Sequence, residues 1–215
     1  MNDLIKKLRE GFLDFLFPQK SPTNLPTEII LRELKKPDDL GGNIVALFDY
    51  GEKLSKKLIW EMKYKNNGKA AKILAEVMYA QIINCLNDWV MFENFHNPIL
   101  IPVPLSKEKL EKRGYNQTEI LVQEIMAIDK EDNLKYEFGA VEKVRETRDQ
   151  SSLKTKTDRL KNLKDCFKIT ALEKVKGRNI IIIDDVYTTG ATIKEIKKIL
   201  KKAGAKKIKA FVAAH

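Results

Sequence analysis

The stretch from residue 179 to residue 213 constrains the fold of this chain more than any other part of the sequence. Its spacing of apolar residues predicts a buried strand at Asn179–Ile183, a helix at Ala191–Ala203 with one apolar face, and a second strand at Lys207–Ala213. A strand, a helix and a strand in succession form a right-handed crossover, which joins parallel strands of one sheet. The sequence therefore predicts an α/β fold in which helices flank a parallel sheet.

Further elements of the same kind precede this unit. Apolar periodicity predicts strands at residues 44–50, 99–103 and 138–144, and helices at residues 52–64 and 69–86. The segment Leu105–Ala127 is expected to begin as a basic loop and to become helical by Thr118. Arg145–Asn162 has no clean apolar period, which makes this stretch a candidate mobile flap.

The N-terminal part of the chain has a different character. Apolar residues within Asp3–Phe17 follow helical spacing and predict a docking helix. Pro18–Gly42 holds four of the 7 prolines and a Gly-Gly pair, so we expect it to be rich in loops and mostly peripheral. The predicted organisation is an extension over residues 1–42, followed by one domain over residues 43–215.

Composition narrows the class of protein. The 215 residues suffice for one α/β domain with a short extension, and no apolar run approaches the roughly 20 residues that cross a bilayer. No signal peptide is recognisable, so we expect a cytoplasmic protein without membrane contact. Cys85 and Cys166 are far apart, which fits a reducing compartment and gives no zinc or disulfide framework. His96 and His215 form no ligand cluster, which argues against hydrolase and metalloenzyme chemistry.

The net charge of +10 favours polyanionic partners such as nucleic acid, a nucleotide or a pyrophosphate. Many lysines fall on helical faces, however, where such charge is commonly solvated surface. Aromatic residues interleaved with basic ones would strengthen a nucleic-acid interpretation, but Trp60 follows Ile59 on an apolar helix and is expected in the core. The charge alone does not select a partner.

The segment Ile180–Thr192 carries the chemistry. Asp184 and Asp185 appear where a buried strand reaches its carboxyl end, the edge at which ligands of open α/β sheets bind. The following Thr-Thr-Gly-Ala-Thr run, Thr188–Thr192, combines hydroxyls, a glycine and the start of a helix, which suits a phosphate. The carboxylates suit a sugar diol or Mg²⁺ around it. Phosphate and diol together describe a ribose 5-phosphate, whereas the alternative is an acidic exit turn with a threonine helix cap.

This segment resembles the signature with which type I phosphoribosyltransferases bind 5-phosphoribosyl 1-pyrophosphate (PRPP). From about Phe12 onward, the chain is also similar to the ComF family of competence proteins within that superfamily. The supporting motifs are Phe15-Leu-Phe-Pro18, Met62-Lys-Tyr64, Ile101-Pro-Val-Pro-Leu105, Arg113-Gly-Tyr-Asn-Gln117, and Gln150-x-x-Leu153 followed by Arg159, Asn162 and Phe167. The resemblance implies a type I phosphoribosyltransferase-like sheet.

The resemblance also implies roles for particular residues. Asp184 and Asp185 would bind the ribose diol and hold Mg²⁺ indirectly, and with Arg113 they are the candidate catalytic residues. The PRPP-binding segment would add Val103, Pro104, Leu105, Val186, Tyr187, Thr188, Thr189, Gly190, Ala191 and Thr192. The flap or pyrophosphate side would comprise Lys63, Arg113, Tyr115, Asn116 and Gln117, although a solvated surface role stays open for Lys63 and Arg113.

Two positions depart from the family pattern. ComF proteins typically carry an N-terminal zinc module, but Ser21 and Asn24 stand where its first cysteines would fall, so we expect no zinc. Thr188 occupies a position at which some phosphoribosyltransferases place a catalytic aspartate, and threonine cannot act as that base. Any transfer would then rest on Mg²⁺ and cations that stabilise the departing pyrophosphate.

Three functions remain open from the sequence. The first is Mg²⁺-dependent phosphoribosyl transfer to an unidentified acceptor. The second is binding of PRPP or a nucleotide without catalysis, and the third is a role in DNA uptake with contacts to single-stranded DNA or the competence helicase machinery. A homodimer is compatible with each of them.

Overall fold

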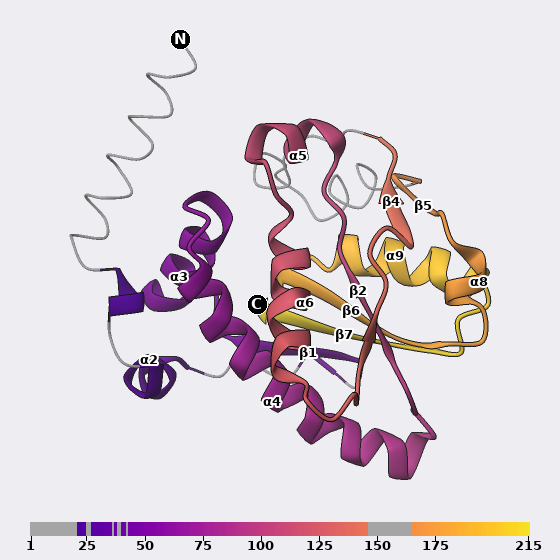
Figure 1. Cartoon of the computed structure of the whole chain (residues 1–215), viewed down its shortest axis with the longest axis horizontal. Helices are drawn as coiled ribbons and strands as arrows, with labels where there is room; N and C mark the ends of the chain where they lie inside the picture. The colour runs from indigo at the N-terminus through magenta and orange to yellow at the C-terminus, as the bar shows by residue number, and fades with distance from the viewer. Residues whose placement is uncertain (1–20, 25–26, 36, 38–39, 42, 146–164) are drawn as a thin grey trace.

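The computed structural model describes residues 21–24, 27–35, 37, 40–41, 43–145 and 165–215. Five strands form a parallel sheet in the order β1-β7-β6-β2-β3 (Figure 1). Their bounds are β1 Ile44–Phe48, β2 Ile99–Pro102, β3 Lys135–Tyr136, β6 Asn179–Val186 and β7 Lys207–Ala214. The predicted parallel α/β fold is thereby confirmed. The helix predicted for Asp3–Phe17 and nearly all of the predicted flap lie outside the described residues.

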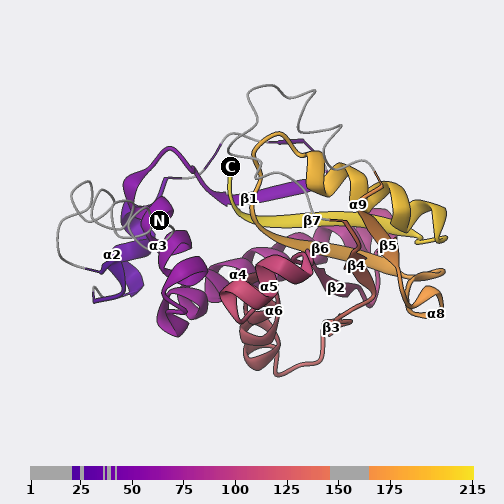
Figure 2. The ribbon, with the colours of Figure 1, turned by 90° about the horizontal axis from the view of Figure 1, so that it is seen from above.

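Helices cover both faces of this sheet, as the view from above shows (Figure 2). One face carries α3, α4 and α6, and the other carries α9. The helices are α2 Thr27–Glu33, α3 Lys53–Tyr64, α4 Gly68–Glu93, α5 Lys107–Arg113, α6 Gln117–Ile128, α8 Leu172–Val175 and α9 Ala191–Lys202. Asn67 caps α4 by accepting hydrogen bonds from the amides of Lys69 and Ala70 at 3.1 and 3.3 Å.

The apolar run of β6 supplies both cores because side chains alternate between the faces of a strand. Ile181 and Ile183 pack into the core under α3, α4 and α6, whereas Ile180 and Ile182 pack under α9. All four side chains are fully buried. Burial on both faces explains why this strand is a continuous run of isoleucine. It also fixes the position at which the chain leaves the sheet after Val186.

The segment before residue 43 is more structured than its prolines suggested. Residues Pro22–Asn24 form a 3-10 turn, and Ile30 of α2 is fully buried in the same core as α3 and α4. Ser21 donates a hydrogen bond at 2.6 Å to Glu61, a carboxylate buried on α3. The expectation of a loop-rich segment is therefore wrong for its described part, although most of the side chains there are exposed or half-buried.

Three further expectations need correction. The basic segment after β2 is not a loop, because Lys107–Arg113 forms α5. The strand predicted for residues 138–144 is limited to β4, Val141–Lys143, which pairs with β5, Phe167–Ile169, in a separate antiparallel sheet. The helix that begins at Gly68 continues past the predicted end at Leu86 to Glu93. Among the described residues, no helix combines the length and the apolar character needed to cross a membrane.

Candidate functional site

Two adjacent carboxylates lie at the carboxyl end of β6. This strand has β7 on one side and β2 on the other, so its end lies in the middle of the edge of the sheet. Asp184 and Asp185 are buried, with 8% and 6% of their surfaces exposed. The amide of Asp185 donates a hydrogen bond to Oδ1 of Asp184 at 2.8 Å, which holds the two residues in a fixed relation.

Side chains from two helices engage Asp185. Nζ of Lys63, at the end of α3, lies 2.8 Å from its Oδ1. Nε2 of Gln117, at the start of α6, donates to its Oδ2 at 2.6 Å. Nη1 of Arg113 in turn donates to Oε1 of Gln117. A chain of polar contacts thus runs from the solvent-facing α5 to the buried acid.

These contacts shift the proton affinities of the site. Burial, reinforced by the neighbouring charge of Asp185, raises the pKa of Asp184 from 3.8 to about 8. Burial lowers the pKa of Lys63, but the charge and the hydrogen bond of Asp185 outweigh that effect, and the pKa lies above its usual value of 10.5. The site therefore holds a protonated Asp184 beside a Lys63–Asp185 ion pair near neutral pH.

The loop between β6 and α9 forms the other half of the site. Gly190 has a φ of 72°, a left-handed conformation that glycine adopts without strain, and α9 begins directly after it. The ring of Tyr187 packs so closely over Gly190 that a Cβ atom there would lie 2.2 Å from the tyrosine hydroxyl. Among the described residues, the hydroxyl of Thr189 is buried without a hydrogen-bond partner. This loop can offer free amides and a hydroxyl to an anion.

The exit of β2 is tied to the start of α6. The carbonyl of Val103 accepts hydrogen bonds from Nδ2 of Asn116 at 3.2 Å and from Oγ1 of Thr118 at 2.7 Å. The hydroxyl of Tyr115 donates to the carbonyl of Met62 at 3.0 Å. Pro104 and Leu105 follow, each half-buried. These bonds hold α3 and α6 together at the position where Lys63 and Gln117 reach the acids.

A hollow of about 550 Å³ opens next to this loop, on the side of α9. It is lined by Ile44, Tyr187, Gly190, Ile193, Lys194, Lys197, Lys198 and Lys201. Neither carboxylate of β6 lines it, so we assign the candidate site to the acidic pair and its surroundings and treat the hollow as a neighbouring surface.

The structure gathers most of the residues that the sequence singled out. Lys63, Arg113 and Gln117 join Asp185 directly or through one another, while Asn116 and Tyr115 position their helices. Thr188 is exposed in the loop, and Val186, Ala191 and Thr192 flank it on β6 and α9. Trp60 was expected in the core, which is wrong: it is only half-buried, and neither apolar core includes it.

Comparisons with known proteins show the family of this chain. The family model described as phosphoribosyl transferase domain matches residues 109–215. Competence protein F of Haemophilus influenzae is 32% identical over 174 residues, covering 80% of this chain and 72% of that protein. The DNA utilization protein YhgH of Escherichia coli K12 is 29% identical, covering 75% and 67%. Competence protein ComFC of Bacillus subtilis is 36% identical, covering 53% and 42%.

Solved structures give looser likenesses. A hypoxanthine phosphoribosyltransferase from Staphylococcus aureus aligns at 12% identity and a TM-score of 0.37, over 68% of this chain and 63% of that one. An allosteric regulatory enzyme of purine biosynthesis aligns at 18% identity and a TM-score of 0.42, over 72% and 30%. The sheet topology and the matching family model define a phosphoribosyltransferase-type protein. Within that class, the chain belongs to the ComF family.

Proposed function

We propose that the site at the carboxyl end of β6 binds PRPP together with Mg²⁺. The observation that carries this proposal is the buried pair Asp184 and Asp185, followed at once by a loop with a left-handed Gly190 and the start of α9. The carboxylates suit the ribose diol, and the loop from Thr188 to Thr192 suits the 5-phosphate. The resemblance of the signature points to the same ligand.

The remaining residues suit the pyrophosphate. Arg113 offers a planar fork of donors, and Lys63 is a half-buried cation at the same edge of the sheet. The turn Val103–Leu105 lies at the exit of the neighbouring strand β2, bonded through Val103 to α6. In our proposal, Lys63 leaves Asp185 for the ligand. Its positive charge then lies where negative charge develops on the departing pyrophosphate.

The residues present fit Mg²⁺. Magnesium prefers carboxylate oxygens combined with phosphate oxygens and water. Asp184 and Asp185 supply the carboxylates, and the phosphate oxygens would come from the ligand. When bound, the ion would neutralise charge on the pyrophosphate. Thr188 cannot act as a base toward the acceptor, so in our proposal transfer rests on the stabilisation of the departing pyrophosphate by Mg²⁺ and cations.

A second candidate is a binding role without transfer, in the handling of DNA during competence. The names of the relatives favour this candidate, since they are called competence proteins and DNA utilization proteins. The two functions share the PRPP site and differ in whether a bond is broken there. Contacts to single-stranded DNA or to helicase machinery belong to this second candidate.

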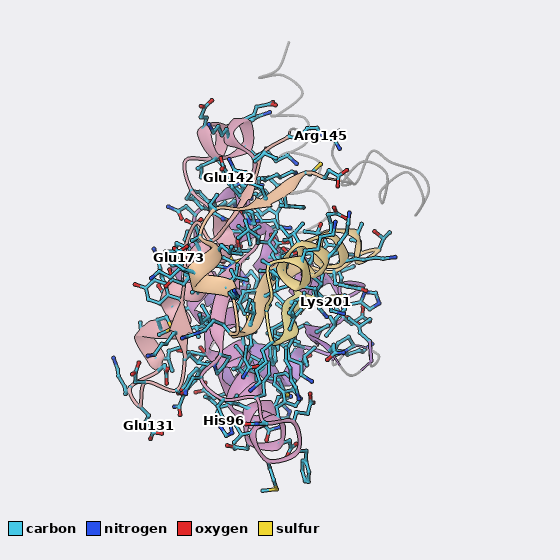
Figure 3. All side chains as sticks on the ribbon, turned by 90° about the vertical axis from the view of Figure 1, so that its right-hand side faces the viewer. His96, Glu131, Glu142, Arg145, Glu173 and Lys201 are labelled. Carbon is cyan, nitrogen blue, oxygen red and sulfur yellow. The ribbon has the colours of Figure 1, made fainter. Side chains whose placement is uncertain are left out.

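Isothermal titration with PRPP, with and without Mg²⁺, tests the proposal. We expect magnesium-dependent binding to the wild type and its loss in the double variant Asp184→Asn/Asp185→Asn. The matched control is Glu131→Gln/Asp132→Asn, an exposed pair of adjacent acids. Glu131 lies at the end of the molecule opposite Arg145 (Figure 3). Folded wild type that does not bind PRPP would refute the proposal and leave a scaffold or DNA-handling role.

A further inference from the structure

A ladder of aromatic and cationic side chains covers the end of α3. Nζ of Lys65 lies 4.8 Å from the centre of the Trp60 ring, and the Trp60 and Tyr64 rings lie 6.1 Å apart. The guanidinium carbon of Arg113, from α5, lies 5.1 Å from the centre of the Tyr64 ring. Each cation lies within the roughly 6 Å at which a ring attracts it. Two cations thus enclose two adjoining rings.

The ladder adjoins the acidic pair. Tyr64 follows Lys63, which is bonded to Asp185, and Arg113 contacts both Tyr64 and Gln117. Gln117 donates the hydrogen bond to the second oxygen of Asp185. A ligand placed on the ladder would therefore share Arg113 with whatever occupies the carboxylates.

The rings are placed to receive a ligand and contribute little to the core. Tyr64 is 51% exposed, and Trp60 belongs to neither apolar core. Large exposed aromatic rings next to cations are the means by which proteins hold unpaired bases, because each base has a π-face that stacks on the ring and a phosphate that the cation attracts. An aliphatic ligand would gain nothing from the cations.

We propose that Tyr64, with Trp60 and Arg113 beside it, is a stacking site for a nucleobase. The inference rests on the proposed function, because it assigns the second ligand of the same site: a base presented next to the phosphoribosyl group. The base can belong to a free nucleotide or to a single strand of nucleic acid. Both sources share the chemistry that the ladder recognises, and the experiment separates them.

Pairs of ligands with and without a base test the inference by titration. The first pair is adenosine 5'-monophosphate and ribose 5-phosphate. The second pair is a 12-residue oligothymidylate and an abasic strand of the same length. The variants are Tyr64→Leu and Tyr64→Phe. The control is Phe92→Leu, because Phe92 is also an exposed aromatic residue, with 77% of its surface exposed. It lies at the end of α4, close to the start of β2 and so at the edge of the sheet opposite the candidate site.

We expect Tyr64→Leu to weaken binding of at least one base-bearing ligand by about tenfold and to leave its base-free partner unchanged. Tyr64→Phe and Phe92→Leu should bind as the wild type does. The pair that responds identifies the source of the base. Equal binding by wild type and Tyr64→Leu, or equal losses for base-bearing and base-free ligands, would overturn the inference.

PRPP titration of the same proteins separates this inference from the proposed function. If Tyr64→Leu binds PRPP normally but the base-bearing ligands do not respond to the substitution, the stacking site alone is refuted. If the wild type fails to bind PRPP while the base-bearing ligands still depend on Tyr64, the proposed function is refuted and the stacking site stands.

Discussion

At each end of the strands of the sheet, a lysine that is at least half-buried is paired with a carboxylate. At the carboxyl edge, Nζ of Lys63 lies 2.8 Å from Asp185, and at the amino edge, Nζ of Lys209 on β7 lies 2.6 Å from Glu93 at the end of α4. At the amino edge the lysine is the more deeply buried partner, because the side chain of Lys209 is 2% exposed and that of Glu93 is 37% exposed. At the carboxyl edge the acid is the more deeply buried partner, because the side chain of Asp185 is 8% exposed and that of Lys63 is 19% exposed.

The surroundings of the two pairs differ as well. Nζ of Lys209 lies 4.6 Å from the centre of the Trp89 ring, and both Trp89 and Glu93 belong to α4, so these contacts attach α4 to the sheet. The carboxylate of Glu93 is partly exposed to water. Asp185 has a second buried acid, Asp184, as its neighbour, and the two share one lysine. Burial and the charge of Asp185 raise the pKa of Asp184 to about 8, so this acid stays neutral near pH 7 until a ligand brings a cation to it. The comparison teaches that the local excess of acid, rather than the lysine itself, distinguishes the candidate site.

Replacing each lysine by methionine gives the largest contrast. Lys63→Met removes the cation beside two buried acids, so we expect the free energy of unfolding to fall by about 3 kcal/mol and PRPP affinity to fall at least about tenfold. Lys209→Met leaves a carboxylate that can turn to water, and its unfolding free energy should change by less than about 1 kcal/mol. Urea unfolding and calorimetry measure both effects. Equal losses in the two variants would show that the pairs are equivalent.

Two left-handed glycines extend the comparison to the backbone. Gly190 at the carboxyl edge and Gly177, just before β6 at the amino edge, have φ values of 72° and 71°. Alanine adds about 1 kcal/mol of strain at either position. Only at Gly190 does its Cβ also meet the Tyr187 ring, whereas the space at Gly177 is open. We expect Gly190→Ala to lower the free energy of unfolding by about 2 kcal/mol and to abolish most PRPP binding. Gly177→Ala should lower the free energy of unfolding by about 1 kcal/mol and leave PRPP binding unchanged.

Thermal unfolding and PRPP titration of the two alanine variants decide this prediction. If Gly177→Ala impairs PRPP binding as much as Gly190→Ala does, the loop after β6 has no special part in holding the phosphate.

Asp184→Asn should act in the opposite direction, because it stabilises the protein without ligand. Because the pKa of Asp184 is raised to about 8, the folded protein binds more protons than the unfolded chain between about pH 4 and pH 8. Its stability therefore falls as the pH rises through that window. Asparagine does not ionise, so the variant without ligand should gain several kcal/mol at pH 8, roughly 5 for a pKa raised by about four units, and almost nothing near pH 4.

Melting temperatures measured across this range check the prediction. Asp132→Asn, at an exposed acid, is the control. A gain that does not depend on pH would mean that the charge of Asp184 is not its source.

Much of the central unit could be predicted from the sequence. The run of isoleucines from 180 to 183 needs burial on both faces, and the apolar positions of α9 repeat at helical spacing, so the strand, helix and strand were recognisable without a structure. The acids could be placed at the carboxyl edge because a strand buried on both faces belongs to a parallel sheet.

Other features left no such pattern. Helix α5 has no buried residue, so its sequence carries no apolar stripe to reveal it. The sequence singled out Lys63, but its ion pair with Asp185 depends on where the end of α3 lies relative to β6, which no local pattern reveals. Trp60 follows an apolar residue, and its exposure depends on the direction in which α3 faces the sheet. Such properties arise from contacts between distant segments.

The proton held by Asp184 has a consequence for calorimetry. A ligand that brings a cation to this carboxylate at neutral pH must expel the proton, and the buffer takes it up. The heat measured for one and the same binding event then depends on the ionisation enthalpy of the buffer, which is small for phosphate and large for Tris. A plot of observed heat against that enthalpy would give the number of protons released.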